Sequence, residues 1–377
     1  MCLLKIVNYA LLSALLLLSQ VASSADLEIH GFISAYGGIN LEKDKVTYGY
    51  KDKFTFQPDS LAGLQFMSKL NDKVSATVQL VSEAKNNYDI EAQWAFIEYK
   101  FNETWSLQTG RIRIPWYMMS DYLNAKKSYH WVRAPSGVYS APFGSFEGVK
   151  LRHKTLLGDW ESDATLTFGN YHNSEYILSG STLPPTLFEA EDWLALTWRL
   201  NSENSHLFLS HHFVEMSLEP DNIKEALAEI GADYPDIAEN IRVKNKSTTI
   251  TALGYIYDNG DFLFQTEVSR FDLDGYFSVQ NSFYASVGKY FDGLLIHITY
   301  EKDENKPHLS YADDIPQGDI KDLATLVLNT QKKDNNVVSI GAKYDIDINT
   351  AFKIQLSSDK TNGIKSKVFT VGLDYLF

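Results

Sequence analysis

The chain of 377 residues has almost no cysteine. Its one cysteine, Cys2, precedes an apolar segment at residues 10–18, so it is not placed as a lipoprotein anchor, which would follow that segment. After Cys2 no thiol remains for a disulfide, a nucleophile or a metal ligand. The sequence therefore excludes functions that depend on cysteine chemistry.

Long apolar runs are also missing after residue 25. No later segment approaches the roughly 18 apolar residues that a membrane-spanning helix needs. Residues 1–25 have Lys5 as their only charge, then the short apolar segment at 10–18, then small residues at 23–25. These are the three regions of a secretory signal peptide, so we expect this segment to be removed on export and the mature chain to begin at Asp26.

An excess of basic residues is absent as well. The chain has 34 Lys and Arg against 48 Asp and Glu, with a net charge of −14 at pH 7. Such an acidic protein is poorly suited to bind nucleic acid, and no nucleic-acid partner is expected. No Pro/Ser-rich linker or low-complexity segment divides the chain, which predicts a single domain over residues 26–377.

Motifs of known enzyme classes are not found. The sequence contains no His-Glu-x-x-His, no Gly-rich phosphate loop and no nucleophile elbow. His211 and His212 are neighbours in a predicted strand, so their rings point to opposite faces and cannot bind one metal ion. We expect no enzyme activity, no cofactor and no metal site.

Aromatic residues, in contrast, are abundant. Phe, Trp and Tyr make up 13% of a chain that is also 22% charged. A membrane-spanning β-barrel needs this combination, because its outer face is apolar, its lumen is polar and aromatic belts flank the bilayer. The composition therefore favours an exported membrane barrel.

The C-terminal segment shows the pattern of such a barrel most clearly. Phe369, Val371, Leu373 and Tyr375 alternate with polar or small residues, and the alternation runs to Phe377. A period of two gives a strand one apolar and one polar face. The segment resembles the terminal strand of Gram-negative outer-membrane proteins, in which the assembly machinery reads the final Phe. An ordinary amphipathic edge strand is the alternative.

Alternating segments of this kind can be counted along the chain. The residues at 258–261, Asp-Asn-Gly-Asp, are the strongest hairpin signal between two of them. The longer connections include short predicted helices at 221–230 and 320–328. The pattern predicts an all-β protein, an antiparallel up-and-down transmembrane β-barrel of about 16 strands, with seven short turns, eight longer connections and both ends of the chain on the periplasmic side. The predicted strands lie near residues 27–39, 61–69, 74–82, 90–100, 105–114, 146–154, 160–170, 191–200, 205–216, 247–257, 262–271, 281–291, 294–301, 337–345, 350–358 and 367–377.

With its signal peptide, its predicted strands and a long third connection, the chain resembles the porin superfamily of Gram-negative outer membranes. The resemblance implies a passive channel for small hydrophilic solutes, a location in the outer membrane and assembly as a homotrimer. It also implies that the third connection, residues 115–144, folds into the lumen and forms the constriction. Contact with outer-membrane lipid and lipopolysaccharide is expected too. Acidic groups at 215–229 and 313–322 could meet divalent cations that bridge lipopolysaccharide, or could be solvated loop surfaces.

The third connection and its flanking strands are locally basic in an acidic chain. Lys150, Arg152 and Lys154 are spaced by two, so all three should face the lumen. Fixed cations in a narrow pore concentrate anions, which predicts an anion bias at the constriction. The alternative is that the arginines pair with Glu83, Glu91, Glu147 or other acids and only hold the loop. The candidate constriction residues are Arg111, Arg113, Asp121, Lys126, Lys127, His130, Arg133, Glu147, Lys150 and Arg152.

The direction of two of these side chains is a difficulty. Trp105 has the same strand parity as Arg111 and Arg113, yet an aromatic residue of this kind is expected on the outer face. Both arginines face inward only if the alternation slips, and Gly110 is the residue at which a β-bulge is expected.

A channel is not the only function open to such a barrel. A closed or plugged barrel could serve as an adhesin, a receptor or a structural protein, because the connections at 218–246 and 302–335 are long enough to cap a pore. A lipid transporter with a lateral opening is a third possibility, but the mature chain begins directly with a strand and not with an apolar plug.

Overall fold

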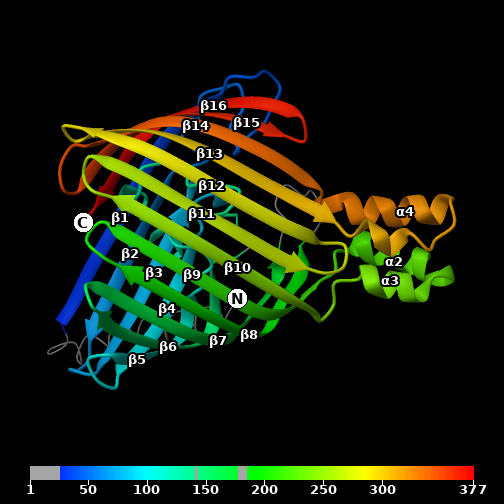
Figure 1. Ribbon diagram of the computed structural model, residues 1–377, viewed down its shortest axis with the longest axis horizontal. Helices are drawn as coiled ribbons and strands as arrows, with labels where there is room; N and C mark the ends of the chain where they lie inside the picture. Colours follow the sequence, from blue (N-terminus) through cyan, green and yellow to red (C-terminus); the bar gives the residue numbers. More distant parts are fainter. Residues whose placement is uncertain (1–25, 141–142, 177–184) are drawn as a thin grey trace, which may run out of the picture.

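The computed structural model describes residues 26–140, 143–176 and 185–377. The predicted signal peptide lies outside the described residues. Sixteen strands form one closed barrel, in which each strand pairs antiparallel with its neighbours in the sequence and β1 pairs with β16 (Figure 1). The predicted strand number and topology are confirmed. The strands are β1 Asp26–Asn40, β2 Leu61–Lys69, β3 Val74–Glu83, β4 Ile90–Lys100, β5 Trp105–Arg113, β6 Ser145–Leu157, β7 Trp160–Tyr176, β8 Thr186–Asn201, β9 Ser205–Leu218, β10 Lys246–Asp258, β11 Phe262–Leu273, β12 Ser278–Phe291, β13 Leu294–Pro307, β14 Lys333–Asp345, β15 Thr350–Thr361 and β16 Ile364–Leu376.

The barrel wall follows from the alternation of apolar and polar side chains along each strand. On β13, Ile296 and Ile298 are 44% and 47% exposed on the outer surface, whereas His297 and Thr299 are buried toward the lumen. A broad apolar outer surface is costly in water but matches the acyl chains of a bilayer. The closed ladder leaves no free strand edge. The barrel is therefore built to span a membrane.

The inner end of the barrel, which carries the short turns, also holds the C-terminus. The amide of Gly31 donates to the carbonyl of Phe377 at 2.8 Å, and the amide of Phe377 donates to the carbonyl of Gly31 at 3.0 Å. These bonds extend the pairing of β1 with β16 to the last residue of the chain. The final residue thus takes part in closing the barrel.

The outer end carries most of the long connections, but the last outer connection differs from expectation. The sequence predicted a longer loop between residues 358 and 367, whereas the strands run on to Thr361 and resume at Ile364. Asn362 and Gly363 form a two-residue turn, with φ angles of 49° and 85°. Asn and Gly tolerate this left-handed backbone, so they allow a tight hairpin.

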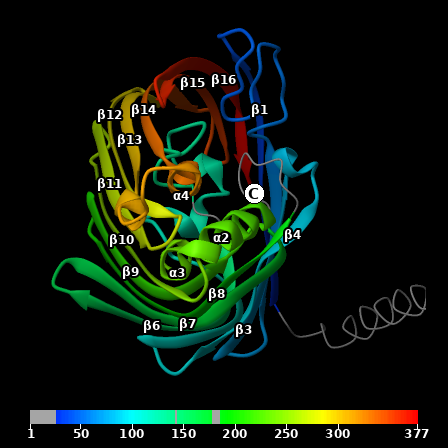
Figure 2. The same ribbon diagram turned by 90° about the vertical axis from the view of Figure 1, so that its right-hand side faces the viewer.

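The third outer connection lies between β5 and β6, and its described residues, 114–140 and 143–144, fold into the lumen as expected; Figure 2 shows them in teal inside the ring of strands. We call this segment the third loop. Trp131 Nε1 donates to Thr299 Oγ1 at 2.7 Å, and the amide of Val132 donates to Gln355 Oε1 at 3.0 Å. These partners lie on β13 and β15, so the loop rests against the wall opposite the strands from which it emerges.

Helices cover part of the outer end (Figures 1 and 2). The helices predicted at 221–230 and 320–328 are confirmed, and their apolar faces, including Leu227 and Val327, belong to one buried cluster. Within the described ranges, no helix has the length and apolar character needed to cross a membrane. The helices are α2 Asp221–Asp233, α3 Pro235–Ile241 and α4 Asp319–Leu328, with short 3-10 helices η1 Ala84–Asn86, η2 Ser120–Tyr122, η3 Lys126–Ser128, η4 Leu309–Ala312 and η5 Asn329–Gln331.

Candidate functional site

The third loop leaves two cavities in the lumen on the side of β1 to β5. The outer cavity has a volume of about 940 Å³ and is lined by the first two outer connections, the third loop and the outer ends of β4 to β7. The inner cavity has a volume of about 310 Å³ and is lined by β1 to β4 and residues 121–125 of the third loop. Arg113 and Asn124 line both cavities. We call this pair of residues the junction.

Buried aromatic contacts hold the two ends of the third loop together and against β8. The ring of Trp116 lies 4.8 Å from that of Trp193 on β8 and 5.7 Å from that of Phe143. Trp116 Nε1 donates to the carbonyl of Phe143 at 2.9 Å, so its polar atom is satisfied. Buried aromatic pairs of this kind contribute roughly 0.5–1.5 kcal/mol each beyond the area they bury. The packing fixes the ends of the loop, and both Trp116 and Phe143 also line the outer cavity.

Hydrogen bonds from the loop backbone reinforce this attachment. The amide of Met118 donates to Glu267 Oε1 at 2.8 Å, and Lys353 Nζ donates to the carbonyl of Trp131 at 3.0 Å while pairing with Asp374 at 2.9 Å. Glu267, Lys353 and Asp374 are all buried. Buried charged groups are costly unless their hydrogen-bonding capacity is filled, and here the loop helps to fill it.

A charged cluster links the third loop to the first outer connection. Asp59 pairs with Arg133 and lies 3.7 Å from Lys126 Nζ, and it accepts a bond of 2.9 Å from the hydroxyl of Tyr50. Burial by itself raises the pKa of Asp59, but the charges of Arg133 and Lys126 outweigh it and hold the pKa below its ordinary value. The carboxylate is therefore ionised at neutral pH. Two of the predicted constriction cations, Lys126 and Arg133, line the outer cavity but are compensated by this acid.

Arg111 closes a seam in the barrel wall. The pairing of β4 with β5 ends at Ala95 and Arg111. Beyond it, Arg111 Nε donates to the carbonyl of Ala92 at 2.8 Å, and its Nη atoms contact Glu147 at 2.6 Å and Glu91 at 3.2 Å. The pairing with Glu91 and Glu147 is the alternative that the sequence left open for this arginine. Side-chain bonds here replace the missing backbone ladder.

A β-bulge at Gly110, which the sequence predicted, does not account for the side-chain directions of Arg111 and Arg113. The register of β5 with β6 continues unbroken through Gly110, although this glycine has a φ of 128°. The alternation slips instead in β4, where the pairing with β3 skips Gln93. Because β5 separates from β4 at this point, Arg113 reaches the cavities without a bulge in its own strand.

Arg113 lies at the junction and forms no ion pair with an acid among the described residues. Its Nε donates to the carbonyl of Ser120 at 2.8 Å and its Nη1 to Gln93 Oε1 at 2.9 Å. Asp121, the acid predicted to balance it, pairs with Arg199 at 3.0 Å. Partial burial raises the pKa of Asp121, but Arg199 and the neighbouring cations lower it further, and the net shift is below the ordinary value. Asp121 thus remains ionised.

Five of the predicted constriction residues lie away from both cavities. Lys127 pairs with Asp345 on β14 at 3.2 Å. His130 contacts Ser286 Oγ at 2.9 Å, and burial lowers its pKa well below the ordinary value, so it is neutral. These two therefore attach the loop to the wall. The other three are Glu147, which pairs with Arg111, Lys150, which is buried, and Arg152, which pairs with Asp163.

Several residues of the site had no signal in the sequence. Asp59 is distant in the chain from Arg133, and only the first outer connection brings them together. Asn124, Gln93 and Trp94 are single residues without a motif, and no sequence pattern distinguishes them from other polar or aromatic positions. The outer cavity also contains eight aromatic side chains, of which the sequence pattern of the third loop indicated four: Trp116, Tyr117, Tyr129 and Tyr139. The eight are Tyr48, Trp116, Tyr117, Tyr129, Tyr139, Phe143, Tyr171 and Tyr176.

Comparison with known proteins gives matches to solved structures. No protein-family model matches the sequence, and no curated protein matches it at a significant level. The fold is similar to that of an anion-selective porin from Comamonas acidovorans, with 11% identity, a TM-score of 0.56 and coverage of 94% of this chain and 100% of the other. It is also similar to the outer membrane channel DcaP of Acinetobacter baumannii, with 12% identity, a TM-score of 0.59 and coverage of 94% and 98%. OmpF of Salmonella typhi matches with 14% identity, a TM-score of 0.56 and coverage of 93% and 97%. At these identities the likeness establishes the fold, a porin-like sixteen-stranded barrel.

Proposed function

We propose that this protein is an outer-membrane channel through which small hydrophilic solutes diffuse passively, with a bias toward anions. The observation that carries the proposal is that the outer and inner cavities, which both lie between the third loop and the wall on the side of β1 to β5, share Arg113 and Asn124. A solute would enter the outer cavity, pass the junction and leave through the inner cavity. Channels of this fold place their selectivity at such a narrowing.

The charges support the proposed anion bias. Five cationic and three acidic side chains line the outer cavity. The cationic side chains are Lys85, Arg111, Arg113, Lys126 and Arg133, and the acidic ones are Asp59, Glu83 and Glu91. A modest excess of fixed positive charge raises the local concentration of anions.

The same proposal implies which molecules surround the barrel in the membrane. The apolar outer surface would contact outer-membrane lipid, and the acidic residues of α2 and α4 would meet lipopolysaccharide through divalent cations. We further propose that the chain assembles as a homotrimer, as its predicted resemblance implies. No catalytic residue and no cofactor enters this function.

Single-channel recording in a planar bilayer tests the proposal. The folded protein should give steady conductance steps, and the reversal potential across a KCl gradient should show preference for chloride. Steady conductance with preference for cations would contradict the proposed anion bias, while the proposal that the protein is a channel would still hold.

A closed barrel acting as an adhesin, a receptor or a structural protein is the second candidate. It is favoured by the helices at the outer end and by the extensive buried cluster that the third loop forms within the lumen. The absence of conductance from protein with the circular dichroism of a folded barrel would support it and overturn the channel.

A further inference from the structure

Arg113 lines the inner cavity, and the buried Lys150, which lines neither cavity, lies behind it. Arg113 is 8% exposed and Lys150 is 9% exposed. Among the described residues, neither has a carboxylate oxygen within 4.0 Å. Lys150 Nζ instead donates to the carbonyl of Arg113 at 3.3 Å, which places the two cations next to each other. A buried charge without a counter-charge is costly, so the site favours a bound anion.

The acids near these cations are already paired. Asp121 contacts Arg199 at 3.0 Å, and Asp163 pairs with Arg152 through two oxygens. Glu83 contacts Lys85 at 3.0 Å. Because each acid pairs directly with a different cation, Arg113 and Lys150 have no direct carboxylate partner among the described residues, and the charge of Asp121 acts on both only from beyond contact distance.

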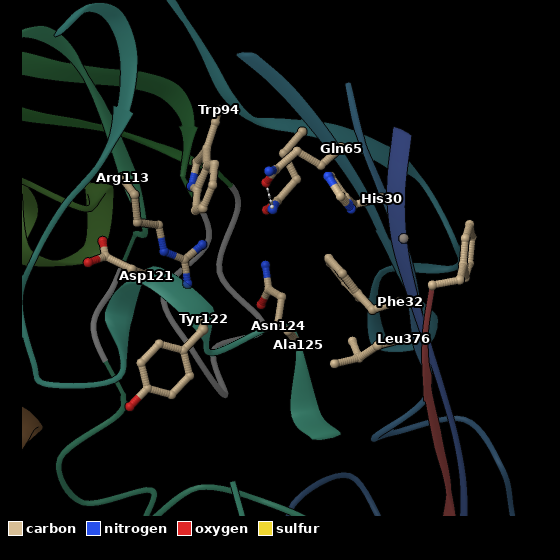
Figure 3. Close-up of a pocket in the computed structure, with 13 residues that line it drawn as sticks. His30, Phe32, Gln65, Trp94, Arg113, Asp121, Tyr122, Asn124, Ala125 and Leu376 are labelled. Atoms are coloured by element: carbon tan, nitrogen blue, oxygen red, sulfur yellow. Dashed lines mark hydrogen bonds between the residues drawn. The ribbon is translucent and has the colours of Figure 1, made fainter. Parts of the chain in front are cut away.

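Arg113 has hydrogen-bonding capacity left for an anion. Its Nε and Nη1 atoms are used by Ser120 and Gln93, and within the described residues its Nη2 has no hydrogen-bond partner. In Figure 3 its guanidinium group extends into the inner cavity between Trp94 and Asn124. A guanidinium with one free amino edge suits the small, planar carboxylate group.

The rest of the inner cavity is lined by amides, by His30, by Asp121, whose carboxylate pairs with Arg199, and by apolar and aromatic side chains. Trp94 Nε1 is buried and has no hydrogen-bond partner among the residues that the structure describes. Gln79 Nε2 donates to Gln65 Oε1 at 2.9 Å, while Gln65 Nε2 contacts only the sulfur of Met67 at 3.2 Å, a weak acceptor (Figure 3). Open amide groups and an indole N–H can exchange hydrogen bonds with hydroxyl groups, and an indole face packs against the C–H face of a ring.

We propose that the inner cavity is a binding site for a monosaccharide-sized, polyhydroxylated carboxylate, that is, a sugar acid. Its carboxylate would bind Arg113 Nη2, with Lys150 adding positive charge behind it, and its ring would lie against Trp94 with its hydroxyls on Gln65, Gln79 and Asn124. The volume of about 310 Å³ admits one such ring. The inference rests on the proposed channel. Because the solute would bind in the inner cavity, its transport through that channel should saturate with concentration.

The experiment is block of single-channel current in a planar bilayer by glucuronate, with glucose as the uncharged comparison. Glucuronate should block the open channel in a concentration-dependent, saturable manner, and glucose should bind about tenfold or more weakly, because it lacks the charge-assisted bond to Arg113. Trp94→Ala should weaken the block by glucuronate about tenfold while open-channel conductance persists. Trp105→Ala, which removes a ring that is 40% exposed on the outer surface, is the matched control and should leave the block unchanged.

The outcomes separate the two proposals. A conducting channel without glucuronate block, or with equal block by glucose, would overturn the sugar-acid site and leave the channel in place. Block that is equally strong in Trp94→Ala would also overturn it. A folded protein without conductance would overturn the channel itself, and equilibrium binding of radiolabelled glucuronate to that protein would then decide the site, with no binding as the contradicting result.

Discussion

At the scale of single residues, Arg113 carries most of the proposed selectivity. It is buried at the junction, it lines both cavities and, in the part of the chain that the structure describes, it has no carboxylate within ion-pair distance. Arg113→Ala removes this fixed charge, so the chloride-to-potassium permeability ratio should fall several-fold. The reversal potential in a KCl gradient measures this ratio. Lys127→Ala, which removes a cation that pairs with Asp345 away from the cavities, should leave the ratio unchanged; an equal effect of both variants would show that Arg113 has no special role.

Asp59 is the residue on which the attachment of the first outer connection to the third loop depends. Asp59→Asn leaves Arg133 and Lys126 buried without their acid, so we expect a loss of about 2–4 kcal/mol in the free energy of unfolding. The midpoint of urea unfolding in detergent measures it. Asp334→Asn, which breaks an exposed pair with Lys302, is the control and should not shift the midpoint measurably.

The same carboxylate makes stability depend on pH in a defined direction. The pKa of Asp59 is lower in the folded chain than its ordinary value of 3.8, so the folded state binds fewer protons than the unfolded state in this range. Its contribution is complete above the ordinary pKa and is lost as the pH falls through the folded-state pKa. The parent protein should therefore lose stability more steeply than Asp59→Asn below about pH 4. Parallel slopes for the two proteins would contradict the assignment.

The charged residues of the site could be predicted from the sequence, but the residues with which they pair could not. Spacing by two placed Lys150 and Arg152 on the lumen face, because strand parity is a local property. The partner of Arg133 could not be predicted in the same way, because Asp59 approaches it only through the tertiary path of two loops. Arg111 and Arg113 conflicted with parity because the sequence does not reveal where β5 leaves β4.

At the scale of elements, the seam between β4 and β5 is the least regular part of the wall. Arg111→Ala removes the bond to the carbonyl of Ala92 and leaves Glu91 and Glu147 without their cation. A loss of roughly 1.5–3 kcal/mol in local stability corresponds to amide exchange that is about tenfold or more faster at the outer ends of both strands. Hydrogen exchange with mass spectrometry measures it.

The control for the seam is Arg270→Ala, because Arg270 forms an exposed pair with Asp272 on a fully paired strand. Exchange near residue 270 should change little. Unchanged exchange at residues 90–93 in Arg111→Ala would mean that the seam is held by something other than this arginine.

Strands were predictable from sequence, and connections only in part. The alternation on β13 and β16 is long and regular, so the number of strands followed from counting. The turn at Asn362 and Gly363 was missed because the polar outer ends of β15 and β16 resemble loop in composition. Helices α2 and α4 were found because a helical apolar face has its own period.

At the scale of the whole molecule, the protein consists of a barrel wall, a loop that folds into the lumen and two cavities on one side of that loop. The third loop rests against β8 to β15 through aromatic contacts and hydrogen bonds, and both cavities lie on the opposite side. The closed barrel and the fold were predictable from the sequence, because closure follows from strand pattern. The side on which the loop leaves space was not, because it depends on which wall the loop's own side chains pack against.

The most direct test of this account is chemical modification at the junction. Because Cys2 lies in the predicted signal peptide, Asn124→Cys gives the exported chain a single thiol at the point where the two cavities meet. A negatively charged thiosulfonate reagent should then reduce the single-channel current in a stepwise manner, whereas Glu203→Cys, in the exposed turn between β8 and β9, should react without loss of current. Full current after complete labelling of Asn124→Cys would contradict the claim that solutes pass the junction of Arg113 and Asn124.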